Sequence, residues 1–419
     1  MTSKLPTYSD YKASGIDWLG DIPSHWECVK SQYIFSLASG ETINGEDFSK
    51  GGLYPVYGGN GIRGYHDKYN LEGKHILIGR VGALCGNIHI TPEKSWVSEH
   101  ALIATPLKQV NLHWLSSLLE TMKLGQYSMA SAQPVIAASN VGKLHIPIPP
   151  IDEQKVIAEY LDEVTGKIDA LVDEKQAQVD ELRAYRTSLI TETVTHGLNP
   201  DAPLRPSGID WLGDIPQHWE TSKLKYIGEA RNGLTYSPDD ICEQGKGVLV
   251  LRSSNIQNEQ LCLEDNVYVS KEVDELMMKE GDILICSRNG SASLVGKCAI
   301  IPKGVNASFG AFMMRYRSII NKRFTLYLVR TTLAQHKAQF ATSTINQLTN
   351  AMIGNMQVAV PPLAEQQAIA DFLDAKTAKI DELISELTKQ IDELTEYKQA
   401  VITEAVTGKV DVRDYKPSN

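Results

Sequence analysis

The sequence has few cysteines and no long apolar run. Its six cysteines never form a Cys-x-x-Cys pair, so they are too sparse for a disulfide framework and too scattered for a ribbon-type zinc site. No stretch approaches the ~18 consecutive apolar residues of a membrane span. The first residues also lack the apolar core that follows a basic flank in a secretory signal. We therefore expect reduced thiols, no membrane association and a cytoplasmic protein.

Enzyme signatures are also missing. The sequence contains no phosphate-binding G-x-x-x-x-G-K-[ST] loop and no dinucleotide fingerprint between a strand and a helix. Its two Pro-Pro pairs lack the preceding Asn or Asp of the tetrad that amino-methyltransferases use. Pro238, Asp239 and Asp240 resemble the start of a nuclease carboxylate set, but no acid-x-Lys follows at a suitable spacing. These absences favour a chain without a catalytic site of its own.

The chain lacks the basic excess that is typical of nucleic-acid-binding proteins, since its net charge is −10. The acidity is confined to two short segments: residues 151–200 carry a net charge of −6 and residues 363–419 one of −5. The longer segments 1–150 and 201–362 carry 0 and +1. Residues 283–337 hold nine bases and no acid. That block can follow a phosphate backbone. The alternative is a basic patch that is solvated or paired with the acidic stretch that precedes it.

What the sequence does contain is an internal repeat within its 419 residues. SGIDWLGDIPSHWE at 14–27 recurs as SGIDWLGDIPQHWE at 207–220, which we call the start motif. IPPIDEQKVIAEYLDEVTGKIDAL at 148–171 matches VPPLAEQQAIADFLDAKTAKIDEL at 360–383, the helix motif. The two shifts are 193 and 212 residues, so the second variable region between the motifs is longer by 19.

The chain ends complete the repeat. Residues 194–208 lead from the first helix motif into the second start motif. Residues 406–418 begin the same passage and stop, and residues 10–15 resume it at the N-terminus. Joined end to start, the termini would rebuild the central junction. The repeat thus predicts a pseudo-twofold ring that is cut open at one junction, with its two termini close together.

Each helix motif continues as a heptad pattern. A helix from Glu153 to Thr191 would be about 58 Å long and would need a partner along its length. The twofold repeat makes the other copy an antiparallel partner, with Gln178 and Gln390 helping to set the register. The alternative is that each helix packs only on its own domain. The predicted seam residues are Ile157, Leu161, Ile168, Leu171, Leu182 and Tyr185 in the first copy, and Ile369, Leu373, Ile380, Leu383, Leu394 and Tyr397 in the second.

The variable regions show short strand-like runs broken by glycine, so we expect an α+β fold. Polar, aromatic and basic residues in their loops have side chains that can read base edges or hold phosphates. The candidate DNA-binding residues are Asn60, Arg63, Tyr65, Arg80, Arg252, Asn255, Arg288, Lys297 and Arg315. For each of them the alternative is a surface loop or a structural ion pair. The tryptophans of the start motifs, Trp18, Trp26, Trp211 and Trp219, are expected in the core, and His25 and His218 are expected to pack or cap.

The doubled start motif and the doubled pattern PPxxEQxxIAxxLDxxTxKID closely resemble the specificity subunit of type I restriction–modification systems, over essentially the whole chain. The resemblance implies two globular target recognition domains and two long helices that form an antiparallel coiled coil, in a pseudo-twofold circular arrangement. The implied boundaries are 1–150 for the first recognition domain, 151–200 for the first spacer helix, 201–362 for the second domain, and 363–419 for the second spacer helix and tail.

The resemblance further implies a non-catalytic subunit that reads an asymmetric, bipartite sequence in double-stranded DNA. It would dock two modification (methyltransferase) subunits, and restriction subunits would join to form the nuclease. The assembled complex would be an adenine methyltransferase and an ATP-dependent endonuclease, whose S-adenosylmethionine, ATP and magnesium bind to the other subunits. Two alternatives remain: a coiled-coil scaffold with protein-binding lobes, and a self-sufficient nuclease or methyltransferase.

Overall fold

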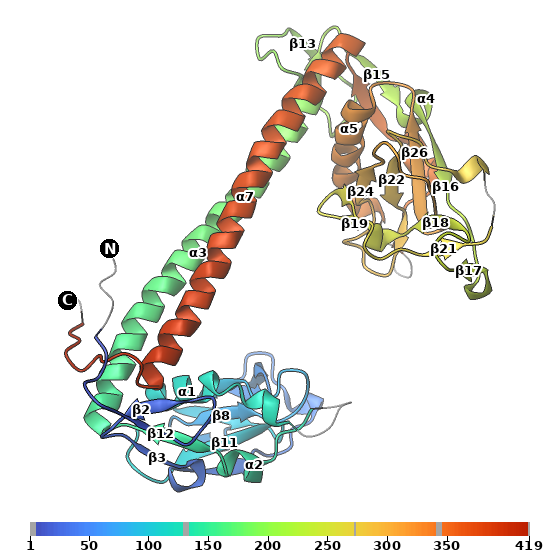
Figure 1. Cartoon of the computed structure of the whole chain (residues 1–419). Coiled ribbons are helices and arrows are strands. Elements are labelled where there is room, and N and C mark those ends of the chain that lie inside the picture. The colour runs from blue at the N-terminus through green and yellow to red at the C-terminus, as the bar shows by residue number, and fades with distance from the viewer. Residues whose placement is uncertain (1–5, 129–133, 272–273, 341–345, 418–419) are drawn as a thin grey trace. The chain divides into compact units, whose positions relative to one another are not determined.

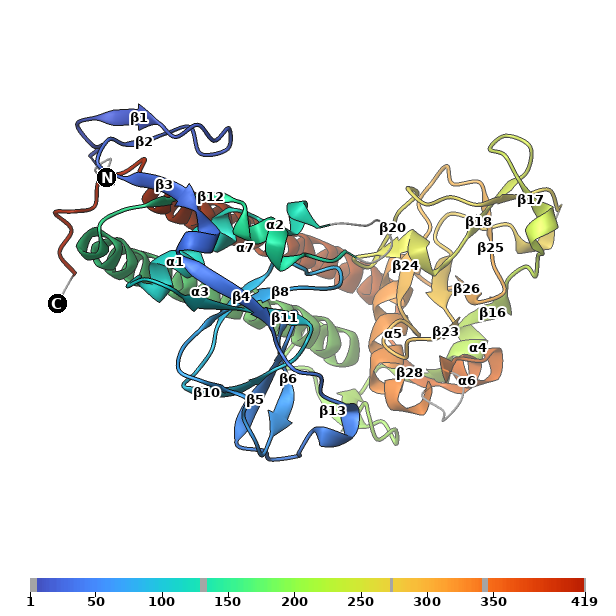
Figure 2. The same ribbon diagram turned by 90° about the horizontal axis from the view of Figure 1, so that it is seen from below.

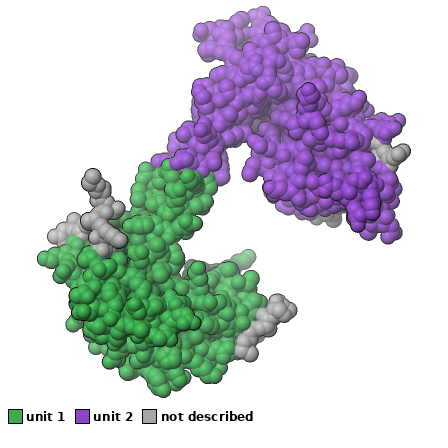
Figure 3. Space-filling model, viewed as in Figure 1, with its two compact units in different colours: residues 1–177, 387–419 green, residues 178–386 purple. Residues whose placement is uncertain are grey.

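The computed structural model describes residues 6–128, 134–271, 274–340 and 346–417. The chain folds into two compact units, one of residues 1–177 with 387–419 and one of residues 178–386 (Figure 3). Two long helices, α3 (Ile151–His196) and α7 (Leu363–Val406), each contribute one part to either unit. Among the described residues no helix has the length and apolar character that a membrane span requires.

The first unit contains two four-stranded sheets. One is antiparallel with the order β4-β11-β8-β9, and the other has the order β6-β5-β10-β7 with β5 and β10 parallel. Two shorter pairs, β1-β2 and β3-β12, join the start motif and the end of the variable region to this unit. The elements before α3 are β1 (Tyr11–Ala13), β2 (Asp21–Pro23), β3 (Glu27–Lys30), β4 (Phe35–Ser39), β5 (Tyr54–Gly58), β6 (Gly61–His66), β7 (Leu71–Glu72), β8 (Ile76–Gly79), β9 (Ile88–Ile90), β10 (Lys94–Val97), β11 (Ala101–Pro106), α1 (Leu112–Thr121), α2 (Ala138–Gly142) and β12 (His145–Ile148).

The second unit repeats the antiparallel sheet, whereas its other sheet has a different strand order, with the parallel pair at one edge. Its sheet β16-β26-β22-β24 matches β4-β11-β8-β9, and β17-β21-β18-β25 again contains one parallel pair, β18 with β25. The hairpin β19-β20 has no counterpart among the named strands of the first unit. The elements are β13 (Leu204–Pro206), β14 (Asp214–Pro216), β15 (Glu220–Lys223), α4 (Leu224–Ile227), β16 (Gly228–Asn232), β17 (Ile241–Cys242), β18 (Val248–Leu251), β19 (Ile256–Gln257), β20 (Gln260–Leu261), β21 (Tyr268–Val269), β22 (Ile283–Cys286), β23 (Arg288–Asn289), β24 (Cys298–Ile300), β25 (Ala307–Phe309), β26 (Met313–Ser318), α5 (Lys322–Gln335), β27 (Asn346–Gln347), α6 (Asn350–Asn355) and β28 (Gln357–Val360).

Helices α3 and α7 pair in an antiparallel manner within each unit (Figures 1 and 2). In the first unit, Lys398 Nζ donates to both carboxylate oxygens of Asp169 at 2.7 Å. In the second, Arg186 Nε lies 2.9 Å from Asp381 Oδ1. Residue numbers on α7 fall as those on α3 rise, so the antiparallel prediction is confirmed. Gln390, which was expected to help set the register, accepts a hydrogen bond from Lys175 Nζ at 2.6 Å.

The seam between the helices differs from the predicted one by one residue in places. After Ile168, both a spacing of three to Leu171 and a spacing of four to Val172 fit the helical period of 3.6 residues. The structure uses the spacing of four: Val172 is half-buried and Val179 is buried. The seam prediction is wrong for four exposed residues: Leu171, Tyr185, Leu383 and Tyr397. Of the remaining predicted residues, Ile157, Leu161, Ile168, Ile369, Leu373 and Ile380 are buried, and Leu182 and Leu394 are half-buried.

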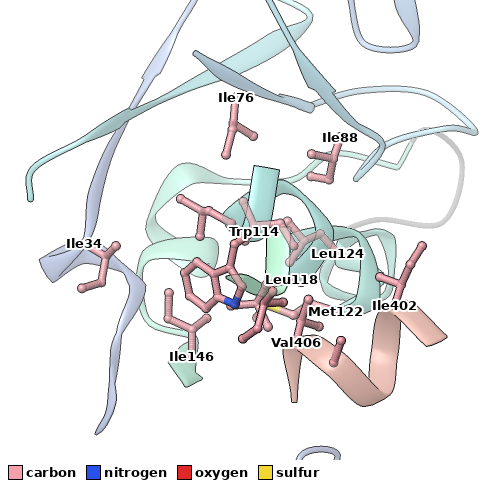
Figure 4. Packing of buried hydrophobic residues seen from close by; sticks show 14 of the residues in the cluster. Ile34, Ile76, Ile88, Trp114, Leu118, Met122, Leu124, Ile146, Ile402 and Val406 are labelled. Carbon is pink, nitrogen blue, oxygen red and sulfur yellow. The ribbon is translucent and has the colours of Figure 1, made fainter. Parts of the chain in front are cut away.

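Each unit has its own hydrophobic core, which includes one end of the helix pair. Figure 4 shows part of the first core, where Trp114 and Leu118 of α1 lie close to Val406 of α7. Trp26 and Trp219 of the start motifs are fully buried in the cores of the first and second units, as predicted. The core prediction is wrong for Trp18, which is 39% exposed because it lies in the turn between β1 and β2. Trp211 is half-buried and donates to Gln357 O at 3.2 Å.

The start motif and the helix motif meet at a buried carboxylate. Glu153, in the first turn of α3, is 6% exposed. It accepts hydrogen bonds from Tyr8 Oη and from Trp26 Nε1 at 3.0 Å, and its Oε2 lies 2.8 Å from His25 Nε2. A carboxylate at this position also complements the positive end of the helix dipole. His25 therefore has the structural role expected of it.

The second unit contains a weaker copy of this contact. Glu365, in the first turn of α7, has its Oε2 2.8 Å from His218 Nε2. Its side chain is 25% exposed, compared with 5% for Glu153. Among the described residues, Trp219 Nε1 has no hydrogen-bond partner. The two junctions thus share their geometry and differ in how completely the carboxylate is enclosed.

The glutamine that follows each glutamate holds the variable region. Gln154 Oε1 accepts from the backbone N–H of Asn111 at 3.0 Å, and Gln366 Oε1 accepts from that of Asn321 at 3.0 Å. The two asparagines are the N-caps of α1 and α5. The Glu-Gln pair of the helix motif therefore fixes both the beginning and the end of a variable region to its long helix.

The chain termini are neighbours in the first unit. The backbone N–H of Asp411 donates to Pro6 O at 2.7 Å, and the guanidinium of Arg413 lies 5.0 Å from the centre of the Tyr8 ring. By the two repeat shifts, Pro6 and Asp411 both correspond to Asn199 of the central junction. The predicted ring is therefore closed by a hydrogen bond between the two ends of the chain, and these ends contain residues that correspond to the same position of the central junction.

Removing the carboxylate at the first junction should destabilise the protein more than removing it at the second. Glu153→Ala leaves buried donors unpaired, so we expect the free energy of unfolding to fall by about 2–3 kcal/mol. Glu365→Ala is the matched control and should cost about 1 kcal/mol, because its carboxylate is more exposed. Denaturant titration of each variant measures the difference. Equal losses would contradict the importance of the buried Tyr8 and Trp26 contacts.

The overlap of the ends defines a circular permutant. Fusing Val410 directly to Pro6 and opening the chain before Asp201 removes the redundant residues and keeps one copy of each junction. The fusion deletes one core residue, Val412, so we expect this permutant to fold with a thermal midpoint below that of the parent chain. Failure to fold, with a permutant that keeps all redundant residues failing as well, would contradict the ring.

Candidate nucleic-acid interface

A cavity of about 1150 Å³ opens among the loops of the second unit. Polar and basic side chains from separate segments of the chain line it together with one exposed aromatic ring. These residues are Arg252, Arg288, Asn289, Phe312, Asn346 and Gln347. Arginine, asparagine and glutamine are the side chains that form bidentate hydrogen bonds with base edges. The cavity is therefore the best candidate for a nucleic-acid contact in this unit.

Arg288 stands at the edge of this cavity, on β23. Its guanidinium carbon lies 5.3 Å from the centre of the Phe312 ring, which is 60% exposed. Arg288 makes no ion pair with an acid in the part of the chain that the structure describes. Glu272, at the start of the acidic stretch considered as its alternative partner, lies outside the described residues. The cation–π contact leaves the hydrogen-bonding edge of the guanidinium available to a ligand.

Arg252 and Asn255 occupy one turn but have different roles. Arg252 Nη2 donates to Asp265 Oδ2 at 2.7 Å at the cavity wall. Asn255 is fully buried: its Oδ1 accepts from the backbone N–H of Arg252 at 2.8 Å, and its Nδ2 donates to Cys262 O at 2.9 Å. Asn255 shapes this turn from inside, so its side chain is not available to a duplex.

Most of the basic block is used inside the second unit. Arg315 is 2% exposed and donates to Glu275 O at 3.1 Å; burial, and then the charge of Arg317, lower its pKa. Arg317 forms a bidentate pair with Asp282, with its Nη2 2.6 Å from Oδ2. Lys297 Nζ donates to a backbone carbonyl at 2.6 Å. Arg317 thus pairs with the preceding acidic stretch, which was one of the alternatives for this block. Arg315 is buried, so its side chain is not accessible to DNA.

The candidates of the first unit lie on two separate features. Asn60, Arg63 and Tyr65 belong to the β5-β6 hairpin, where Arg63 lies 6.0 Å from the centre of the Phe48 ring and Tyr65 is 47% exposed. Asn60 Oδ1 accepts from a neighbouring asparagine amide at 2.7 Å. Arg80 follows β8 and donates to a serine hydroxyl of β4 at 3.1 Å.

Arg80 and Arg288 follow similar strand-like runs, ILIG and ILIC, and would be equivalent by that likeness, but the backbone shows that they are not. The N–H of Arg80 donates to His100 O at 2.9 Å, and the matching bond in the second unit runs from Ser287 N–H to Phe312 O at 3.0 Å. Arg288 is therefore one residue farther along than the equivalent of Arg80. Since neighbouring residues of an extended chain point to opposite faces, the two arginines cannot be assumed to share a role.

One ion network was not visible in the sequence. Glu259, in the hairpin β19-β20, has its Oε2 3.0 Å from Nη1 of Arg186 on α3 and 3.0 Å from Nη1 of Arg330 on α5. The hairpin belongs to the additional length of the second variable region. It ties the recognition fold of the second unit to the long helix. The sequence indicated only that the second variable region is longer by 19 residues, and this length difference did not point to Glu259 or its partners.

The carboxylates that resembled a nuclease set cap a turn. Asp240 accepts from the backbone N–H of Ser237 at 2.6 Å, and its Oδ2 lies 2.9 Å from Lys271 Nζ. The Ser237 bond, followed by the bond with Lys271, lowers the pKa of Asp240 to about 2. In the described ranges, no three acidic, histidine or cysteine side chains form a group that could hold a metal ion.

A family model supplies the decisive comparison. The model for the type I restriction modification DNA specificity domain matches the chain twice, at residues 23–181 and 216–393. The chain belongs to this specificity family. Both matches run from a start motif, through a variable region, into a long helix, which are the segments that the repeat delimits.

Individual relatives agree with the family assignment. The EcoprrI specificity subunit of Escherichia coli is 41% identical over 110 residues, which cover 26% of this chain and 27% of that relative. The MjaVIII specificity subunit of Methanocaldococcus jannaschii is 23% identical over 350 residues, covering 81% of this chain and 77% of the relative. A chain from a solved type I R-M system has a TM-score of 0.68 at 15% identity, covering 92% of this chain and 98% of that one. It shows the same fold.

Replacing Arg288 should distinguish its possible roles. If Arg288 reads a base, Arg288→Ala should cost about 1–3 kcal/mol on the specific site and relax one position. If it binds a phosphate, affinity should fall on every sequence and the salt slope should drop by about 1. Because the guanidinium has no acidic partner among the described residues, we expect thermal stability to stay unchanged. Unchanged affinity in a normally folded variant would remove Arg288 from the interface.

Proposed function

We propose that this chain is the DNA sequence-recognition subunit of a type I restriction–modification complex. Each variable region reads one half of a bipartite target in double-stranded DNA. The observation that carries the proposal is the repetition of one scaffold with different loops. Both units contain the same antiparallel sheet order and the same Glu–His junction to a long helix, whereas the side chains at the strand ends differ. Two unlike readers on one repeated frame fit an asymmetric target.

The long helices are the proposed docking surface for two modification subunits. The four exposed seam-flanking residues form two equivalent pairs, Leu171 with Tyr397 beside the Asp169–Lys398 contact of the first unit, and Leu383 with Tyr185 beside the Arg186–Asp381 contact of the second. Two identical apolar pairs suit two copies of one protein better than they suit a single partner. The acidic helices would repel DNA, which also favours a protein partner there. Restriction subunits would join this assembly.

In this proposal the chain itself catalyses no reaction. Adenine methylation and ATP-dependent cleavage are assigned to the modification and restriction subunits, together with S-adenosylmethionine, ATP and magnesium. The chain contributes the choice of sequence and the placement of the modification subunits.

Exchange of single variable regions tests the division of labour. The chain is co-expressed with its modification subunits, and methylated adenines are mapped in the host DNA. Replacing residues 28–140 with the corresponding region of another family member should change one half of the methylated sequence. Replacing residues 221–345 should change only the other half. A single exchange that altered both halves would contradict the proposal.

DNA binding separates this function from the alternatives. Because several phosphates are neutralised, affinity of the complex for its target should fall steeply with salt in a log–log plot. A scaffold with protein-binding lobes would show no such specific binding. Methylation or cleavage by the purified chain alone would favour the self-sufficient enzyme.

A further inference from the structure

His100 and Phe312 occupy equivalent positions in the two recognition folds. Each directly precedes an inner strand of its four-stranded antiparallel sheet, β11 or β26. Each carbonyl oxygen accepts the N–H that follows the neighbouring strand, from Arg80 at 2.9 Å in the first unit and from Ser287 at 3.0 Å in the second. The same backbone frame thus presents an imidazole in one unit and a phenyl ring in the other.

The backbone at Phe312 is held firmly. Its carbonyl oxygen also accepts from the N–H of Arg288 at 3.1 Å, and the N–H of Met313 donates to Gly310 O at 2.8 Å, closing a tight turn. The flanking residues Phe309 and Met313 are 0% and 1% exposed, whereas Phe312 is 60% exposed. The ring therefore projects from a rigid turn that is anchored in the core on both sides.

The surroundings of the ring suit a nucleic-acid base. Phe312 borders the cavity of about 1150 Å³, and the Arg288 guanidinium lies against it at 5.3 Å from the ring centre. Asn289, Asn346 and Gln347 line the same cavity and can hydrogen-bond to base edges. Proteins that insert an apolar side chain at a base step partly unstack it and kink the duplex. A rigidly mounted ring loses little conformational freedom when it does so.

We propose that Phe312 is an apolar wedge that stacks at one base step of the half-site read by the second unit, with Arg288 held beside it at the same step. The first unit presents His100 at this position, so its half-site is read without a phenyl wedge. The proposal rests on the proposed function and adds a specificity-determining residue to it.

The test uses the complex of the full chain with its modification subunits and a duplex that carries its methylated target. 2-Aminopurine is placed in turn at each position of the second half-site. The methylated adenine gains fluorescence in any case, because a methyltransferase flips its target base out of the duplex. The parent complex should also raise the fluorescence at one other step, where the wedge unstacks the base. Phe312→Ala should abolish that rise and weaken binding about tenfold or more, since base–aromatic stacking contributes this much. Phe312→Trp should keep both properties.

Ile319→Ala is the matched control. Ile319 is 78% exposed in the same unit and its backbone is also anchored, but it does not line the cavity. This variant should bind and raise fluorescence as the parent does. Thermal unfolding of Phe312→Ala should match the parent, because the deleted ring lies outside the core.

The outcomes separate this inference from the function on which it rests. If the parent complex binds its target but Phe312→Ala binds equally well, or if no position of the half-site other than the methylated adenine gains fluorescence, the wedge is wrong and the recognition function stands. If the parent complex does not bind the DNA at all, the proposed function fails and the wedge fails with it.

Discussion

The contact between a glutamate in the first helical turn and the start motif is the interaction on which the rest of the structure depends. The carboxylate of Glu153 forms hydrogen bonds with the side chains of Tyr8, His25 and Trp26. The adjacent Gln154 accepts a hydrogen bond from the N-cap residue of α1. A single turn of helix thereby fixes where a variable region begins and how its own helix is attached. Neither anchor uses a side chain from a recognition loop, so those loops can change without the loss of either anchor.

Much of the architecture could be predicted from the sequence because two motifs occur twice and so show how the chain is divided. Two motifs with shifts of 193 and 212 residues define two like halves, and halves related by a twofold axis have helices that run in opposite directions. The closeness of the termini follows from the same comparison. The exact seam could not be predicted, because spacings of three and four both fit an α-helix, and packing against the opposite helix decided between Leu171 and Val172.

The candidate site was harder to predict than the fold. A residue type indicates what a side chain can bind, but its burial depends on partners far away in the sequence. Arg315 and Asn255 have the chemistry of base readers and are used to hold loops from within. Arg288 and Phe312 were brought together by the pairing of β22 with β26, a contact that no local pattern reports. Glu259 remained hidden because a lone acid in a turn has no signature.

The near identity of the two start motifs has a consequence for inheritance. Recombination between the gene segments that encode residues 14–27 and 207–220 would excise 193 residues without altering the motif itself. The product would keep the N-terminal segment, one start motif, the second reader and α7, and it would lack α3, the opposite helix against which α7 packs. Two such chains could pair their helices with each other and restore the ring from identical halves. Their combined target would then be a palindrome, so one recombination event would change an asymmetric recognition sequence into a symmetric one.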